Sequence, residues 1–434
     1  MSIATSSPKF PAHTLKLDNG LTVIHQYIPA TPVVVVDVWV RAGARQEPDR
    51  WSGMAHFLEH MIFKGTEKLG PGIFDRIIEN RGGIANAATS HDYAHFFITS
   101  AAKYIEEIVP ALAELLLRAS IPELEFTIER EVVLEEIRQS QDSPDEIGFQ
   151  ALMENVYQLH PYGRSVMGTE ALLREREVHE MRCFHRYHYQ PENMAVVVVG
   201  GVEQRQVIEL VSTAFEQFLP TCSDCPQVEI EREALITEVR RQEIHLPRLE
   251  QSRLTMAWIG PGVEQLDDAY GLDLLSVLLA EGRSSRLVRE LREDLGLVQG
   301  IGSNFSLQQD SSLFTISAML EAKDIPEVEE RICDRLDELL TLEVSQVELA
   351  RCKRLLCNDY VFSTESPGQL AGLYGYYFTI ANPELAVIYP EKIAAFQPKE
   401  LLNLAEKYLS PNRYAATVLI PSYGDGEMGR LKYR

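Results

Sequence analysis

Apolar residues along the chain follow two spacings, and the order of those spacings indicates how the chain folds. Alternating or short continuous apolar runs predict strands over 21–28, 33–43, 92–101 and 194–200. Apolar residues recurring every three to four positions predict helices over 51–63, 72–81, 104–117 and 124–139. Strands and helices thus come in separate runs, which favours mixed or mainly antiparallel sheets with helices on one face.

The same order of elements begins again in the second half of the chain. Three pairs of segments resemble each other in sequence: 33–65 and 251–282, 96–144 and 314–367, and 187–200 and 408–421. A stretch rich in proline and small polar residues separates the two copies. We therefore predict an α+β protein with two homologous halves, over 1–218 and 234–434, joined by a linker over 219–233.

One predicted helix breaks its apolar pattern with three ionisable side chains. The stretch GMAHFLEHMIFKGT, residues 53–66, contains His56, Glu59 and His60. Positions i, i+3 and i+4 share one face of a helix, so both imidazoles can reach one metal ion. Glu59 would then lie beside a metal-bound water, as in the inverted zinc-peptidase motif H-x-x-E-H. The alternatives are a chance match or histidines that are hydrogen-bonded within a core.

The second copy of the repeat serves as an internal control for these three residues. When Gly271 is aligned with Gly53, the equivalent positions are Leu274, Val277 and Leu278. These three positions are apolar, as positions of a buried helix should be. The fold therefore does not require the His-Glu-His group, and the first copy carries it for another reason.

A catalytic zinc site needs one more protein ligand, and the helix predicted over 124–139 supplies acidic candidates. Glu129 and Glu136 are two helical turns apart and face the same way. Their counterparts in the second copy are Cys352 and Asp359. The alternative is an ordinary solvated acidic face, and the spacing alone leaves both interpretations open.

Composition excludes several classes of protein. The formal net charge of −23 makes nucleic acid and anionic lipid poor partners. No apolar run is long enough to span a membrane, and no secretion signal is visible, so we expect a cytoplasmic protein. Six cysteines do not suggest a disulfide scaffold, and we expect Cys222 and Cys225, a lone C-x-x-C, to be linker thiols without a ligand role.

The motifs in this order resemble the pitrilysin family of zinc peptidases. H-x-x-E-H is followed by GGIANAATSHDYAHF, EREVVLEEI, HPYGRSVMGTEALL, FHRYHYQPENMAVVVVGGV and EGRSSRLVRELREDLGL, so the resemblance covers nearly the whole chain. The size resembles the short, two-domain branch of the family and, within it, the zinc-bearing β subunit of the mitochondrial processing peptidase. Members of that branch pair two chains into a clamshell chamber.

The resemblance implies a role for each acidic and histidine residue of the two helices. His56, His60 and Glu136 would bind one Zn²⁺ per chain, and Glu59 would act as the general base. Glu129 matches an acidic position near the site and would be an outer partner of a ligand histidine.

The resemblance also implies how peptides are held. Asn86, Ala87 and Ala88 would form an edge strand that pairs with an extended peptide. The family usually closes over the substrate carbonyl with an Arg and a Tyr seven residues later, but here Arg292 is followed by Gln299. An amide lacks the acidity of a phenol. We therefore expect a heterodimer with a homologous subunit that supplies the Arg/Tyr pair, or alternatively a homodimer.

The expected function is that of a zinc-dependent endopeptidase that admits unfolded peptides or presequence-like segments to a chamber between two chains. The alternatives are a non-catalytic structural subunit of a complex and a peptide-binding subunit that holds zinc but turns over slowly.

Overall fold

A computed structural model describes residues 10–247 and 249–422. The chain divides into two compact units, and neither is continuous in sequence. The first unit comprises 1–139, 164–230 and 361–388, and the second comprises 140–163, 231–360 and 389–434. Each unit therefore contains a short segment from the other half of the chain.

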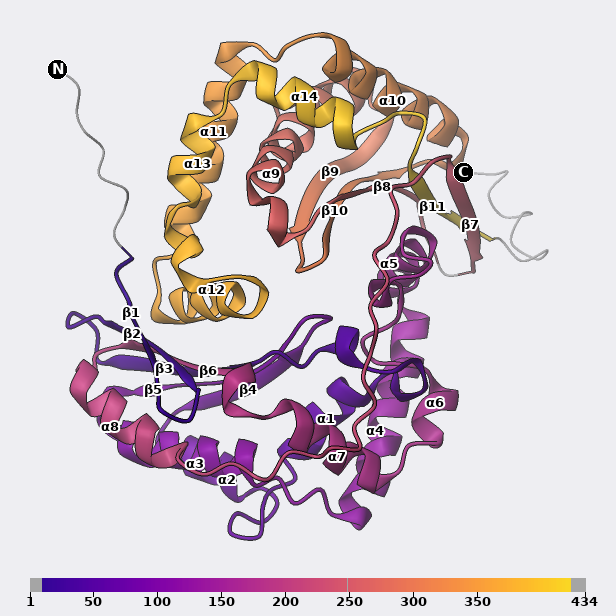
Figure 1. Cartoon of the computed structure of the whole chain (residues 1–434). Coiled ribbons are helices and arrows are strands. Elements are labelled where there is room, and N and C mark those ends of the chain that lie inside the picture. The colour runs from indigo at the N-terminus through magenta and orange to yellow at the C-terminus, as the bar shows by residue number, and fades with distance from the viewer. Residues whose placement is uncertain (1–9, 248, 423–434) are drawn as a thin grey trace, which may run out of the picture. The chain divides into compact units, whose positions relative to one another are not determined.

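The first unit is built on a six-stranded sheet with the order β1-β2-β6-β3-β5-β4 (Figure 1). Its strands are β1 (His13–Lys16), β2 (Thr22–Tyr27), β3 (Val33–Val40), β4 (Ile84–Thr89), β5 (Ala94–Ala101) and β6 (Met194–Gly200). β2 and β6 are parallel, and all other neighbouring strands are antiparallel. β4 lies at one edge of the sheet.

The second unit repeats this arrangement with five strands in the order β7-β11-β8-β10-β9. They are β7 (Arg240–Leu246), β8 (Ser252–Pro261), β9 (Val298–Leu307), β10 (Ser311–Leu320) and β11 (Ala415–Pro421). β7 and β11 are parallel and the other neighbours antiparallel, matching β2-β6-β3-β5-β4 strand for strand. The prediction of a duplicated α+β fold with mixed, mainly antiparallel sheets is confirmed.

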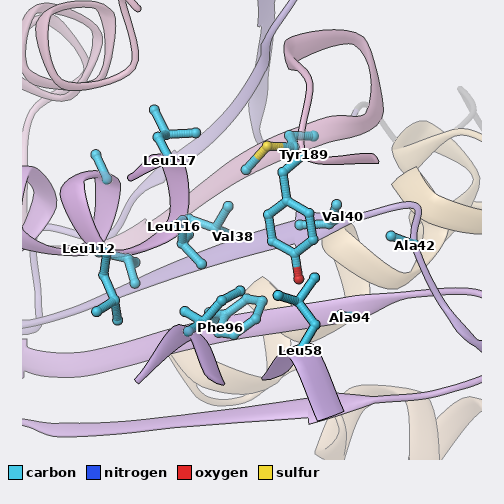
Figure 2. Close-up of a cluster of buried hydrophobic side chains, with 14 of the residues drawn as sticks. Val38, Val40, Ala42, Leu58, Ala94, Phe96, Leu112, Leu116, Leu117 and Tyr189 are labelled. Atoms are coloured by element: carbon cyan, nitrogen blue, oxygen red, sulfur yellow. The ribbon is translucent and has the colours of Figure 1, made fainter. Parts of the chain in front are cut away.

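Seven helices of the first unit contribute to one hydrophobic core on one face of its sheet. They are α1 (Met54–Ile62), α2 (Ile73–Glu79), α3 (Ile105–Leu117), α4 (Glu123–Asp142), α6 (Glu170–Arg174), α7 (Val178–His188) and α8 (Gln204–Ala214). Alternate residues of β3 and β5, such as Val38 and Phe96, point into this core beside Leu58 and Leu116 (Figure 2). The period of two along each strand thus places one set of side chains under the helices.

Five helices of the second unit pack in the same way on its own sheet. They are α9 (Leu266–Ala280), α10 (Ile325–Thr341), α11 (Gln346–Phe362), α13 (Tyr389–Ala395) and α14 (Pro398–Tyr408). No helix among the described residues is long and apolar enough to cross a membrane.

The opposite face of each sheet carries a helix from the other half of the chain, which the sequence did not lead us to expect. α12 (Pro367–Ile380), orange-yellow in Figure 1, lies against β3 and β6 of the first unit. The contact is close, because a Cβ on Gly375 would fall 2.0 Å from Nε1 of Trp39. α5 (Pro144–Val156) lies against β11 of the second unit. Both helices begin with Ser-Pro, and the hydroxyls of Ser143 and Ser366 cap them.

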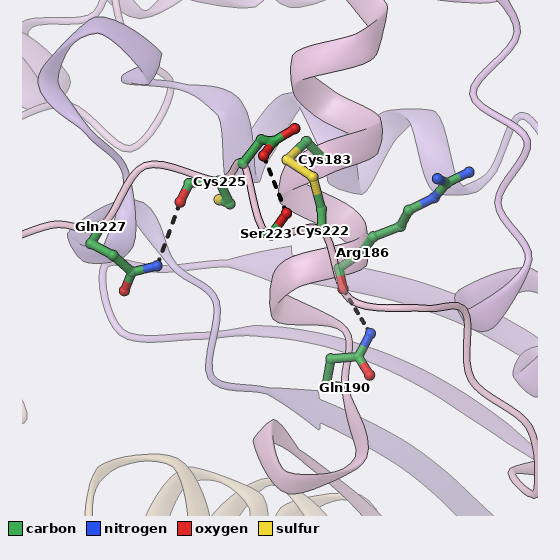
Figure 3. Close-up of a disulfide and its surroundings, with 8 residues drawn as sticks. Cys183, Arg186, Gln190, Cys222, Ser223, Cys225 and Gln227 are labelled. Atoms are coloured by element: carbon green, nitrogen blue, oxygen red, sulfur yellow. Dashed lines mark hydrogen bonds between the residues drawn. A yellow bond between two sulfur atoms is a disulfide. The ribbon is translucent and has the colours of Figure 1, made fainter.

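A disulfide joins Cys183 of α7 to Cys222 in the segment that follows α8 (Figure 3). The expectation that Cys222 is a free linker thiol is therefore wrong, because the two cysteines are far apart in sequence and only the fold brings their Cα atoms to 5.3 Å. Cys225 is a free thiol, and burial raises its pKa to about 11. Disulfides persist mainly in oxidising compartments, so this bridge does not favour the cytoplasmic location, which stays a prediction.

Candidate metal centre

The start of α1 is fixed by a buried carboxylate instead of the usual serine or aspartate cap. Glu47 accepts hydrogen bonds from the backbone N–H groups of Gly53 at 2.9 Å and Ala55 at 2.6 Å. Burial raises the pKa of Glu47 to about 8, and the two backbone bonds partly oppose this shift. Gly53 has a φ of +92°, and a Cβ there would meet the carbonyl oxygen of Met167 at 2.5 Å. These contacts thus fix the orientation of the first turn of α1.

His56, Glu59 and His60 lie on the face of α1 that is turned away from the core. The remaining side chains of the helix are almost fully buried: Met54, Ala55, Phe57, Leu58, Met61 and Ile62. The two imidazole rings lie with their centroids 4.8 Å apart, and their side chains are 16% and 18% exposed. The apolar face anchors the helix, and the polar face presents two nitrogen donors side by side.

Glu136 of α4 completes a group of three possible ligands. Its Oε2 lies 3.4 Å from Nε2 of His60 and 3.9 Å from Nε2 of His56. The three ligand atoms lie within 4.8 Å of one another, the one such group of three or more His, Cys, Asp or Glu side chains found in the described part of the chain. Two imidazoles and a carboxylate are a donor set that zinc prefers, so the residues fit that ion.

Burial sets the protonation of His56, and a neighbouring carboxylate contacts the ring of His60. Burial, and then the proximity of His60, lower the pKa of His56 to about 4, so its ring is neutral at pH 7 and has a lone pair to offer. Nδ1 of His60 lies 3.0 Å from Oε1 of Glu129. With Nδ1–H donating to this carboxylate, the lone pair of His60 is on Nε2, which faces Glu136.

Glu129 and Glu136 therefore take different positions although they share a face of α4. Glu129 is 6% exposed, and its Oε2 pairs with Nζ of Lys64 at 2.6 Å. Glu129 contacts Nδ1 of His60, whereas Glu136 faces Nε2 on the other side of the ring. The sequence spacing left either glutamate open as the third ligand, and the geometry separates an outer partner from a candidate ligand.

Glu59 lies beside the three-residue group and is oriented by a residue that the sequence analysis did not single out. Oγ1 of Thr89, the last residue of β4, donates to Oε2 of Glu59 at 2.6 Å. Burial raises the pKa of Glu59, and the bond from Thr89 opposes that shift. Thr89 lies in the GGIANAATS stretch, but nothing in its spacing from Glu59 predicts the contact.

The residues expected to bind peptide lie in two different units. Asn86, Ala87 and Ala88 belong to β4, which pairs with β5 on one side and, within the described residues, ends the sheet on the other. Arg292 belongs to a π-helical turn, η7 (Val288–Asp294), of the second unit and forms an ion pair with Glu293. Gln299 lies in β9 and is exposed.

Comparison with models of known protein families identifies the family of this chain. Residues 22–170 match the insulinase model of peptidase family M16, and residues 177–356 match the model described as the peptidase M16 inactive domain. The chain therefore belongs to peptidase family M16, and the expected kinship with pitrilysin-like zinc peptidases is confirmed. The second model lies mostly on the half in which leucine and valine replace the histidines and glutamate.

Several individual proteins are similar over nearly the whole chain. Zinc protease PqqE of Helicobacter pylori is 29% identical over 417 residues, which span 95% of this chain and 93% of that protein. The crystal structure of a protease from Helicobacter pylori is likewise 29% identical and superposes with a TM-score of 0.88, covering 96% of this chain and all of that one. Pitrilysin, at 18% identity and a TM-score of 0.80, shares the fold, with 97% of this chain matching 46% of that chain.

Proposed function

We propose that this chain is a zinc-dependent endopeptidase that hydrolyses unfolded peptides or presequence-like segments. The observation that carries the proposal is the convergence of His56, His60 and Glu136, with Glu59 beside them on the same helix. The zinc proteases among the relatives support the same chemistry.

The side chains of α1 and α4 would have separate roles in the reaction. A zinc ion held by His56, His60 and Glu136 would supply Lewis-acid chemistry, lowering the pKa of a water and polarising a carbonyl. Glu59 would accept the proton of the attacking water and pass it to the leaving amine. Glu129 would keep Nε2 of His60 as the donor atom.

Strand β4 would hold the peptide. Its free edge offers backbone N–H and C=O groups to an extended chain, and the small side chains of Ala87 and Ala88 leave room for close backbone approach. Peptide binding by strand addition suits unfolded segments, because the backbone groups of an extended, unpaired chain are available to pair with the edge strand.

We further propose that the chain works as the zinc subunit of a two-chain enzyme. Arg292 is followed seven residues later by Gln299, where the family usually has tyrosine. A homologous partner without the zinc motif would supply the Arg/Tyr pair, and a homodimer is the alternative.

The test is cleavage of a quenched fluorescent peptide by the purified chain, alone and mixed with a homologue that has the Arg/Tyr pair but lacks H-x-x-E-H. Glu59→Gln should abolish cleavage, whereas Glu135→Gln, at a solvent-facing position of α4, should leave it unchanged. Activity only in the mixture supports the two-chain enzyme, and full activity alone supports the homodimer. Zinc binding without cleavage in either setting would contradict the peptidase and leave the peptide-binding subunit.

A further inference from the structure

The carboxylate of Glu59 is held by the sheet as well as by its own helix. The alternation of β4 places Thr89 on the same face as Ala85 and Ala87, which pack against the core that contains α1. From there Oγ1 of Thr89 donates to Oε2 of Glu59 at 2.6 Å. A hydrogen bond from a hydroxyl to a carboxylate oxygen at this distance is strong, and it restricts the orientation of the carboxyl group.

The backbone at Thr89 is itself anchored on both sides. Thr89 pairs with Ala94 of β5. The next residue, Ser90, donates from its N–H to the carbonyl of Tyr93 at 2.8 Å and accepts from the N–H of Ala44 at 3.1 Å. The hydroxyl that contacts Glu59 therefore has a fixed position relative to the sheet.

We propose that Thr89 is a positioning residue that orients Glu59 for proton transfer from the attacking water. Thr89 directly follows Asn86, Ala87 and Ala88 in β4. Strand β4 would thus position both a peptide bound at its edge and the Glu59 carboxylate. The distance between the attacked carbonyl and the general base would therefore be set by one strand. This inference rests on the proposed peptidase function and deepens it.

A purely structural role is the competing explanation, since a half-buried carboxylate benefits from any donor. The two roles differ in what they require. A structural role tolerates any residue that keeps the strand and the helix packed, whereas a positioning role requires a hydroxyl at this place and affects turnover more than substrate binding.

The experiment compares Thr89→Val, which keeps the branched shape but removes the donor, with Thr89→Ser, which keeps the donor. Thr99→Val makes the same chemical change on β5 and is the matched control. Each full-length variant is assayed for kcat and KM in whichever setting, alone or mixed, gives the wild-type activity. Zinc affinity is measured by competition with a chelator, and crystal structures of the metal-free variants report the orientation of the Glu59 carboxylate.

For Thr89→Val we expect kcat to fall about 10- to 100-fold, part of the full contribution of a general base, with KM changed less than about threefold. Thr89→Ser and Thr99→Val should stay within about threefold of wild type in kcat, and all variants should bind zinc alike. In the crystals, the Glu59 carboxylate should turn in the valine variant and stay in place in the serine variant.

Normal kcat in Thr89→Val would overturn the proposal, as would equal loss in the valine and serine variants or an unmoved Glu59 in the valine crystal. If the wild-type chain cleaved nothing, the proposed function would fail. The comparison of the Glu59 orientation in the two crystals would still decide whether Thr89 positions it.

Discussion

Helices α1 and α9 occupy equivalent positions under the two sheets, but only α1 carries candidate chemistry. In α9 the equivalent residues Leu274, Val277 and Leu278 are at most 5% exposed and belong to the core. In α1 the same positions hold two histidines and a glutamate. The same helix position is thus filled by either set of side chains, and packing alone does not account for the polar group of α1.

The second helix of each site shows the same contrast. Cys352 of α11 is fully buried where α4 has Glu129. A small thiol fills that space with one contact from the guanidinium of Arg351 at 3.7 Å, whereas the Glu129 carboxylate needs both His60 and Lys64 to compensate its burial. The first repeat thus holds a network of His60, Glu129 and Lys64 in a place where the second repeat has a single buried thiol.

The largest effect should come from making α1 like α9. The double substitution His56→Leu and His60→Leu removes two of three ligands and should reduce peptide cleavage by about 1,000-fold or more. Metal analysis should find no bound zinc. The metal-free variant should be at least as stable as the metal-free wild type, because the leucines are those that the second repeat packs.

Thermal unfolding in the presence of a chelator measures that stability. A variant that unfolds well below the wild type would mean that the histidines have a packing role. Retention of one zinc per chain would mean that the ion binds elsewhere.

The reverse change tests whether the second repeat tolerates the chemistry of the first. Leu274→His places an imidazole in a fully buried position of the second hydrophobic core and should destabilise the protein by about 3 kcal/mol. Leu295→His, at a position that is 45% exposed in the same unit, is the control and should change little. Urea denaturation measures both. A loss below about 1 kcal/mol for Leu274→His would show that α9 can accommodate polar groups without a network.

The contrast between α1 and α9 also shows what could be predicted from sequence. The spacing of His56, Glu59 and His60 is local, so their common face followed from helical geometry alone. The duplicated sheets followed from the repeated hydrophobic pattern. The choice of Glu136 over Glu129 came from the family resemblance, because the two share a face and only the packing of α4 against α1 distinguishes them.

Features that depend on long-range packing were not predicted. The bond between Thr89 and Glu59 joins a strand end to a helix, and side-chain direction at that junction is set by the packing of α1 on the sheet. α5 and α12 each pack on the sheet of the unit built mainly from the other half of the chain. Which sheet face a helix covers cannot be read from the hydrophobic period of its sequence. The Cys183–Cys222 bridge likewise depends on the path of the chain after α8, which brings Cys222 back to α7.

A smaller effect is expected from giving α4 the residue of α11. Glu129→Cys removes the acceptor for Nδ1 of His60 and should weaken zinc binding about 10- to 100-fold without removing a ligand. Glu131→Cys, on the exposed side of α4, should leave the affinity unchanged. Chelator competition measures both. Equal affinities in the two variants would contradict the role of Glu129 as the partner that orients His60.

The smallest effect concerns acid stability and contrasts α7 with α14. Burial lowers the pKa of His188 in α7 to about 4, whereas Leu409 holds the matching place after α14. The unfolded chain takes up a proton below pH 6.5 and the folded protein does not, so the stability contributed by neutral His188 is full above pH 6.5 and is lost as the pH falls from 6.5 toward 4.

His188→Leu should therefore reduce the loss of stability between pH 7 and pH 5.5 by about 1 kcal/mol, as judged from urea unfolding of the metal-free protein. His179→Leu removes a histidine of the same helix that is 75% exposed and is the control for the loss of an imidazole from α7. If His188→Leu lost stability with acid as steeply as the wild type, His188 would have to be protonated in the fold, and the apolar character of this end of α7 would not resemble that of α14.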